Sequence, residues 1–341
     1  MAGSTSPFGG GIHQEGDQPS ACGSETYGER TGLGAELMQR NDRIVRVATV
    51  TQDRLDRESS VALVEETIER LDRAAYRGPD IACLPETFSG YDAQPVPGPI
   101  TERLSAWARD RSCYVICPMR TEVTGRMFNS AIVLDRQGEI MGRYDKIHLT
   151  EGELAGGVVP GEADPPVFQT DFGTIGGQIC FDVNWPESWR RLQEKGAEIV
   201  FFPSAFPAHR QLSSLSWENE FYIVSATKTR SSRVYDITGE VLAESGYFQP
   251  WADAALHLGK RLFEIDYHTD KARRLQQKYG GRALVHWCHE ESWFTLASQD
   301  PDLSVAELME EFGLVPLRTY LSRCEQALHD ARGRYRDSAS D

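Results

Sequence analysis

The chain has 341 residues and a formal net charge of -15, with 51 acidic and 36 basic side chains. This length can bury a substantial core and exceeds the usual size of a single domain. The acidic balance argues against a nucleic-acid partner, whose phosphates call for a basic face. No cationic start followed by an apolar run marks a secretory signal, and no stretch has the apolar length to cross a bilayer. We therefore expect a cytoplasmic protein without a membrane partner.

The seven cysteines are an odd number and lie widely scattered along the chain. A disulfide framework is not expected in a chain of this size without secretory features. His286, Cys288 and His289 could suggest a metal, but no second paired cluster completes a tetrahedral set. The sequence therefore predicts neither a metal nor a cofactor.

Three segments of the chain differ in composition. Residues 1–43 are rich in Gly, Ser, Gln and Glu without apolar periodicity, which predicts a flexible N-terminal arm. In residues 44–270, short apolar strands alternate with amphipathic helices. The charged, amphipathic pattern that follows predicts a helical C-terminal extension over 271–341. This extension would serve subunit packing or form plain surface helices.

Within the central segment the predicted elements alternate in type along the chain. Strands are expected at 44–50, 81–84, 114–117, 130–134, 140–144, 174–180, 198–202 and 222–226, and helices at 55–75, 100–109, 187–195 and 212–220. The two halves echo each other, since Asp80–Pro85 parallels Glu198–Pro203 and the hairpin turn at 135–138 parallels that at 236–239. Buried-type strands need cover on both faces. We therefore predict two related sheets packed together with helices outside them.

Three predicted strands end at residues that can carry chemistry. Glu86 follows the strand at 81–84, Lys146 follows the strand at 140–144, and Cys180 precedes a helix that begins at Pro186. A thiol ahead of a helix N-terminus lies where negative charge is favoured. Ligand sites of α/β sheets lie beyond the carboxyl ends of the strands, so these groups would supply a base, a cation and a nucleophile. The plainer alternatives are a buried core cysteine and a structural Glu86–Lys146 ion pair.

The residues around these three positions resemble the nitrilase (carbon–nitrogen hydrolase) superfamily. The matching motifs, which occur in the family's order, are Leu84-Pro85-Glu86, Tyr144-Asp145-Lys146-Ile147-His148-Leu149 and Ile179-Cys180-Phe181-Asp182. The resemblance spans residues 44–267 and implies an α/β fold of the four-layer α-β-β-α sandwich type. It also implies a homodimer or a higher homo-oligomer.

The resemblance assigns catalytic roles to four residues. Cys180 would attack a carbonyl carbon, Glu86 would take its proton, and Lys146 would stabilise the oxyanion together with a backbone N–H. Family members carry a second glutamate shortly after the lysine, and both Glu151 and Glu153 are available here. The spacing from Lys146 favours Glu153, which would orient the lysine and the attacking water.

The resemblance also bears on the substrate. Phe181-Asp182 after the nucleophile favours small-molecule amides or ureido (N-carbamoyl) compounds over nitriles. Carbamoylases of the family carry arginines just beyond this point, where this chain has Val183 and Asn184, so Arg210 or Lys228 would have to substitute. The candidate substrate-binding residues are Phe181, Asn184, Trp185, Ser204, Phe206 and Arg210.

Other functions share parts of this pattern. A nitrilase, or an acyltransferase that uses an acceptor other than water, would keep the same fold and cysteine. A non-catalytic binding module is disfavoured because Glu86, Lys146 and Cys180 are all present. A cysteine–histidine hydrolase would need a histidine beside Cys180, and no motif supports one.

Overall fold

The computed structural model of the protein describes residues 43–55 and 60–338, so the predicted arm at 1–43 lies almost entirely outside the described residues. The helices are Ser60–Ala74 (α2), Ala75–Arg77 (η1), Pro99–Arg111 (α3), Glu151–Ala155 (α4), Cys180–Asn184 (η2), Pro186–Glu194 (α5), His209–Asn219 (α6), Thr269–Tyr279 (α7), Gly280–Arg282 (η3), Val305–Phe312 (α8) and Leu317–Ser338 (α9). The strands are Ile44–Val50 (β1), Ile81–Cys83 (β2), Gln94–Pro95 (β3), Tyr114–Val123 (β4), Arg126–Leu134 (β5), Ile140–Asp145 (β6), Val167–Gln169 (β7), Thr174–Gly177 (β8), Ile199–Ser204 (β9), Tyr222–Thr227 (β10), Arg233–Tyr235 (β11), Val241–Glu244 (β12), Trp251–His257 (β13), Arg261–Glu264 (β14), Ala283–Cys288 (β15) and Trp293–Ser298 (β16).

Two large sheets carry the predicted internal repeat. One has the order β13-β1-β2-β4-β5-β6, with β3 added beside β4, and the other has the order β12-β11-β10-β9-β8-β7. In the first sheet β1, β2 and β4 are parallel and β5 and β6 follow antiparallel. In the second, β8, β9 and β10 are parallel and β11 and β12 follow antiparallel. The two halves therefore share one topology, as their sequences indicated.

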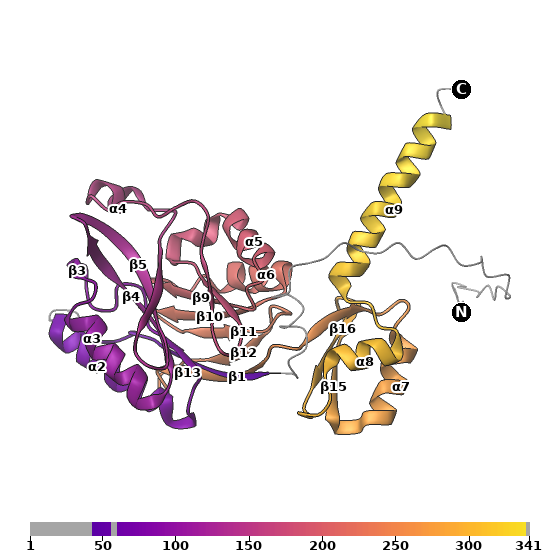
Figure 1. Cartoon of the computed structure of the whole chain (residues 1–341), viewed down its shortest axis with the longest axis horizontal. Coiled ribbons are helices and arrows are strands. Elements are labelled where there is room, and N and C mark those ends of the chain that lie inside the picture. The colour runs from indigo at the N-terminus through magenta and orange to yellow at the C-terminus, as the bar shows by residue number, and fades with distance from the viewer. Residues whose placement is uncertain (1–42, 56–59, 339–341) are drawn as a thin grey trace, which may run out of the picture. The chain divides into compact units, whose positions relative to one another are not determined.

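The sheets face each other across the main core, and helices cover their outer faces. Strand β9 shows why, because Ile199 and Phe201 join the core between the sheets while Val200 and Phe202 pack on the other side. The outer face of the first sheet packs against α2 and α3, and that of the second against α5 and α6 (Figure 1). Alternate side chains of a strand point to opposite faces, so fully apolar strands require this double cover. The predicted α-β-β-α sandwich is confirmed.

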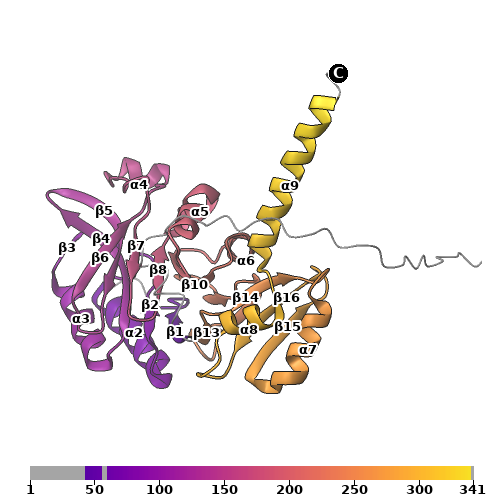
Figure 2. The ribbon, with the colours of Figure 1, turned by 45° about the vertical axis from the view of Figure 1, so that its right-hand side comes forward.

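The segment past residue 270 differs from the sequence prediction. Helices α7, α8 and α9 are present, but β15 and β16 lie among them and pair with β14 in a three-stranded sheet. Helices α7 and α8 lie against this sheet (Figure 2) around a core that includes Phe263, Leu275 and Phe294. The prediction of helices alone was wrong because it rested on the charged, amphipathic helices of this segment and passed over the six-residue strands β15 and β16.

Candidate active site

Cys180 lies at a sharp turn between β8 and α5. Cys180 is the first residue of η2, its φ is 49°, and the residue is buried with 8% of its surface exposed. A positive φ is uncommon for a residue other than glycine, and such strain is found at functional sites. The turn presents the thiol beyond the end of the strand, as the sequence predicted, and α5 begins with Pro186 in its first turn.

Asp182 ties this turn to the segment that carries Lys146. Its buried carboxylate accepts hydrogen bonds from the Ile179 N–H at 2.8 Å and from the Tyr144 hydroxyl at 2.7 Å. It also accepts the His148 N–H at 2.9 Å, and its Oδ1 lies 2.8 Å from His148 Nδ1. The motifs Tyr144–Leu149 and Ile179–Asp182, which are distant in sequence, are thus joined through one carboxylate. Sequence reasoning had used Asp182 only as part of a pattern.

Lys146, Glu86 and Glu153 meet in a buried cluster. The Lys146 Nζ lies 3.1 Å from Glu86 Oε1 and 2.9 Å from Glu153 Oε2, and the lysine side chain is 1% exposed. Glu153 is held by a capping box at the start of α4, in which Thr150 N–H donates to its Oε2 at 3.0 Å. Glu151 is exposed to solvent on the same short helix. The geometry therefore brings Glu153, and not Glu151, to the lysine.

Two residues that sequence reasoning missed complete the cluster. The Nδ2 of Asn129 donates to Glu86 Oε1 at 2.8 Å and to Glu153 Oε1 at 2.9 Å. The Nη2 of Arg120 lies 3.1 Å from Glu153 Oε1, and both Asn129 and Arg120 are buried. The signal for Asn129 was a polar side chain directly before the predicted strand at 130–134, at the position whose carbonyl accepts the Lys146 N–H in the hairpin. Two carboxylates and two cations balance in charge here, which is how charges are normally accommodated when buried.

The electrostatic environment links Cys180 to this cluster. The pKa of the Cys180 thiol is raised to about 12, because burial and the charge of Glu86 raise it more than Lys146 and the hydrogen bonds from Ala205 N–H and Ser204 lower it. Burial lowers the pKa of Lys146, but Glu86, Cys180 and Glu153 outweigh this effect, so the pKa is raised. Burial raises the pKa of Glu153, but Lys146 and the bonds from Thr150 and Asn129 bring it below its ordinary value. At neutral pH the thiol therefore holds its proton beside a carboxylate and a fixed cation.

The candidate substrate-binding residues divide into two groups. Ser204, at the end of β9, is buried and bonded to Cys180, and its Oγ accepts the Phe206 N–H at 3.1 Å. Trp185 is half-buried and stacks on the His148 ring at 4.1 Å, with Phe181 edge-on to it at 5.1 Å.

The second group lies on the surface. Asn184 and Arg210 are exposed, and the side chain of Phe206 is 36% exposed. The Asn184 Nδ2 donates to the Phe181 carbonyl at 3.0 Å, which closes the turn after Cys180. Lys228, considered as a substitute for the missing arginines, is buried at the end of β10 and donates to Thr87 Oγ1 at 2.5 Å. It therefore lies directly beside Glu86 in the fold.

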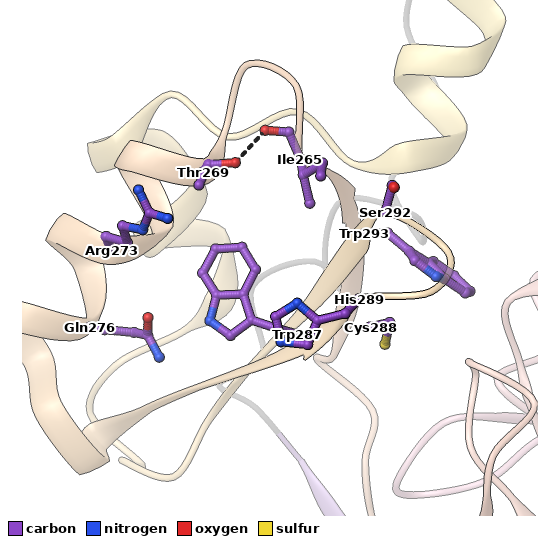
Figure 3. Close-up of a pocket in the computed structure, with 9 residues that line it drawn as sticks. All are labelled: Ile265, Thr269, Arg273, Gln276, Trp287, Cys288, His289, Ser292 and Trp293. Atoms are coloured by element: carbon purple, nitrogen blue, oxygen red, sulfur yellow. Dashed lines mark hydrogen bonds between the residues drawn. The ribbon is translucent and has the colours of Figure 1, made fainter. Parts of the chain in front are cut away.

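A separate cavity lies in the C-terminal extension and holds two of the residues considered for a metal. It has a volume of ≈ 360 Å³ between α7 and the ends of β15 and β16, and Trp287 lies at its centre (Figure 3). Cys288 and His289 line it, but no group of three His, Cys, Asp or Glu side chains that could hold a metal occurs among the described residues.

No helix in the described ranges is long and apolar enough to cross a membrane.

The sequence is similar to those of known carbon–nitrogen hydrolases. Residues 44–259 match the family model "Carbon-nitrogen hydrolase". The chain is 28% identical to omega-amidase NIT2 of Xenopus tropicalis over 207 residues, which are 51% of this chain and 75% of that protein. It is 30% identical to N-carbamoylputrescine amidase of Solanum lycopersicum over 191 residues, 51% of this chain and 63% of that protein.

Solved structures show the same fold. An amidase from Nesterenkonia sp. superposes with a TM-score of 0.56 at 22% identity, covering 69% of this chain and 96% of the amidase. Saccharomyces cerevisiae Nit3, a member of branch 10 of the nitrilase superfamily, superposes with a TM-score of 0.56 at 21% identity, covering 70% of this chain and 96% of Nit3. The chain therefore belongs to the carbon–nitrogen hydrolase family and is a hydrolase of carbon–nitrogen bonds other than peptide bonds.

Proposed function

We propose that the protein hydrolyses the amide or N-carbamoyl group of a small molecule through a thioester on Cys180. The observation that carries this proposal is the buried cluster of Lys146 with Glu86 and Glu153, at 3.1 and 2.9 Å, whose charges act on the Cys180 thiol. A general base and a fixed cation next to a thiol are what attack on a carbonyl carbon requires. The amidase relatives support this substrate class over nitriles.

The reaction proceeds in two halves. Glu86 takes the proton of Cys180 as the sulfur bonds to the carbonyl carbon, and the resulting oxyanion faces Lys146 and the N–H that follows Cys180. Glu86 then returns the proton to the departing nitrogen, and the amine or ammonia leaves a thioester behind. Water, deprotonated by Glu86, attacks the thioester, and the proton passes to the sulfur as the acid is released. Removing one oxyanion donor typically costs about 3–4 kcal/mol of transition-state stabilisation.

Glu153 and Asn129 act by position in this scheme. Glu153 bonds to Lys146, while Asn129 bonds to both carboxylates, so the ammonium and the Glu86 carboxylate are held in one orientation. Fixed donors that need no reorganisation during the reaction are the main source of electrostatic catalysis. Glu153 would thus orient the lysine and, in the second half, the attacking water.

A product-release assay separates the candidate reactions. Primary amides, N-carbamoyl compounds and nitriles are incubated with the enzyme while ammonia and carbon dioxide are measured. Ammonia alone from amides supports amide cleavage, both products together indicate N-carbamoyl cleavage, and activity on nitriles alone would contradict the proposal. Faster consumption of the acylated enzyme by added amines than by water would favour acyl transfer.

The nucleophile assignment is tested by Cys180→Ala, which should abolish turnover with the fold retained. Cys117→Ala is the matched control and should keep its turnover. Cys117 is a fully buried cysteine of β4 that packs on the outer face of the first sheet, away from the core between the sheets. Full activity in Cys180→Ala would refute the assignment.

We also propose a hydrolase domain at 44–270 and a role in self-association for the extension at 271–341. In α9, Leu317, Leu321, Cys324 and Leu328 recur at alternating steps of four and three residues. This spacing is that of a coiled-coil seam, and a second copy of the chain supplies a matching stripe. Leu317 packs into the core, whereas Leu321 and Leu328 are 49% and 54% exposed, so the stripe is open to such a partner from Leu321 onward.

A further inference from the structure

A cavity rich in arginine opens beside the proposed active site. It has a volume of ≈ 480 Å³, within the range of small-molecule sites, and lies at the carboxyl ends of β1 and β10. Arg54, Arg70 and Arg230 line it with Asp53 as the one carboxylate, so two positive charges are in excess. In a chain with a net charge of -15 this local excess of cations is notable. We call this cavity the arginine pocket.

Arg70 forms the inner wall of the arginine pocket. Its Nη1 donates to the carbonyl oxygens of Thr51 at 2.5 Å and Asp53 at 3.0 Å, which are neutral acceptors. Glu66 and Asp53 attract the guanidinium, but its burial has the larger effect and lowers its pKa. No ion pair within 4.0 Å joins Arg70 to a carboxylate of the described residues. Within the described ranges, Arg70 is thus a half-buried cation that is attracted by Glu66 and Asp53 without a direct ion pair to either.

Asp53 organises the loops around the arginine pocket and forms its one described ion pair with Arg54. Its Oδ1 accepts the backbone N–H of Arg230 at 3.0 Å, and its Oδ2 lies 3.5 Å from Arg54 Nε. Arg54 also stacks over the Tyr247 ring at 4.5 Å. The side chain of Arg230 is exposed and forms no ion pair with a described residue. Arg70 and Arg230 therefore remain for an anion from outside.

The sheet register places the arginine pocket next to the proposed catalytic residues. Strands β1 and β2 are parallel with Thr49 opposite Cys83, so both run toward the same edge, where Thr51 lines the pocket and Glu86 follows β2. Adjacent strands are about 4.8 Å apart. On the other sheet Thr227, three residues before Arg230, pairs with Ser204, which bonds to Cys180. The Thr227–Ser204 pair thus connects the strand that leads to Arg230 with the residue that is bonded to Cys180.

We propose that the arginine pocket binds a carboxylate or phosphate group at the end of the substrate opposite to the bond that is cleaved. This inference rests on the proposed function and narrows it to amides or N-carbamoyl compounds with an anionic tail. Guanidinium groups bind carboxylate and phosphate through paired, charge-assisted hydrogen bonds. The hydroxyls of Ser231 and Ser245 also line the pocket. The pocket thus selects among substrates, while Cys180 performs the reaction on all of them.

The test compares substrates that differ only in the tail. Linear primary amides with a terminal carboxylate are paired with neutral alkyl amides of the same chain length, and kcat/KM is measured for each. The ratio of anionic to neutral kcat/KM should favour the anionic amide in the wild type and fall at least tenfold in Arg230→Gln. Arg274→Gln, an exposed arginine of α7 outside the arginine pocket, is the matched control and should keep the ratio. If Arg230→Gln leaves the ratio of anionic to neutral kcat/KM unchanged, the proposal is overturned. This holds also when kcat/KM falls equally for both amides.

A binding measurement tells whether the arginine pocket takes the tail of a substrate or a free anion. It also tests the pocket separately from the proposed hydrolase function. Calorimetry on Cys180→Ala with an anionic amide should show binding that weakens at least tenfold when Arg230→Gln is added. Binding of inorganic phosphate without any preference for anionic amides would identify a free-anion site and overturn the substrate assignment. If no amide is hydrolysed by the wild type, the proposed function fails, and this binding measurement still decides whether the arginine pocket takes anions.

Discussion

Replacing Lys146 by methionine probes the buried cluster most directly. Methionine keeps an unbranched side chain of similar length but removes the charge that lies 3.1 Å from Glu86 and 2.9 Å from Glu153. Two buried carboxylates would then face each other with only Arg120 left to balance them. Removing one partner of a buried ion pair typically costs about 3–5 kcal/mol. We expect the free energy of unfolding of Lys146→Met to fall by this amount at pH 7, and turnover to be lost.

The pH dependence of this loss has a definite sign. Burial raises the pKa of Glu153, but Lys146 holds it below its ordinary value of 4.5 in the folded protein. The Glu153–Lys146 pair therefore stabilises the fold fully above pH 4.5, and this contribution is lost as the pH falls through the pKa of Glu153 in the folded state. Burial lowers the pKa of Lys146, but the charges of Glu86 and Glu153 raise it above 10.5. The contribution of Lys146 to stability is therefore complete below pH 10.5. The deficit of the variant should therefore be full at pH 7 and shrink in acid.

Urea unfolding followed by tryptophan fluorescence measures the effect, with the slope of free energy against urea as a check on the unfolded state. The control is Lys195→Met, because Lys195 pairs with Asp164 at 2.7 Å on the surface, with 32% and 70% of the two side chains exposed. A surface pair contributes about 0–1 kcal/mol. If Lys146→Met were no less stable than this control, or if its deficit did not shrink in acid, the cluster would not be held by charge as argued.

Two further predictions concern Ser204 and α9. Burial raises the pKa of Cys180, and the hydrogen bond from Ser204 offsets part of this rise, so Ser204→Ala should raise the pKa further. Alkylation by iodoacetamide and turnover should both slow by roughly tenfold to a hundredfold, which is the worth of a hydrogen bond to a charged group. Ser213→Ala, which removes a hydroxyl bonded to Gly239 outside the site, should leave the alkylation rate unchanged, and an equal rate in both variants would contradict the role of Ser204. Leu328→Asp places a charge in the apolar stripe of α9 and should lower the mass measured by sedimentation from that of a dimer to that of a monomer. If the wild-type protein is itself a monomer, the proposed self-association through α9 is wrong.

The sequence alone was sufficient for the layers of the sandwich and for the positions of three reactive groups. Central strands such as β2 and β9 read as apolar runs because both of their faces are covered, whereas β6, which leads to Lys146, mixes polar and apolar residues. Glu86, Lys146 and Cys180 stand just past strand ends, so the strand pattern predicted their positions together with the short motifs around them. The repeat of the two halves was visible for the same reason, since each element has a local pattern.

The tertiary structure alone decided which distant side chains meet. Asn129 and Arg120 join the cluster from the middle of β5 and β4, where only strand register determines their neighbours. The choice of Glu153 over Glu151 depends on the capping box that begins α4, since both carboxylates lie within one turn of it. The arginine pocket gathers side chains from separate loops, which come together only because β1 and β10 end at the same edge of two packed sheets. Periodicity specifies an element, whereas proximity across the fold is a property of the packing.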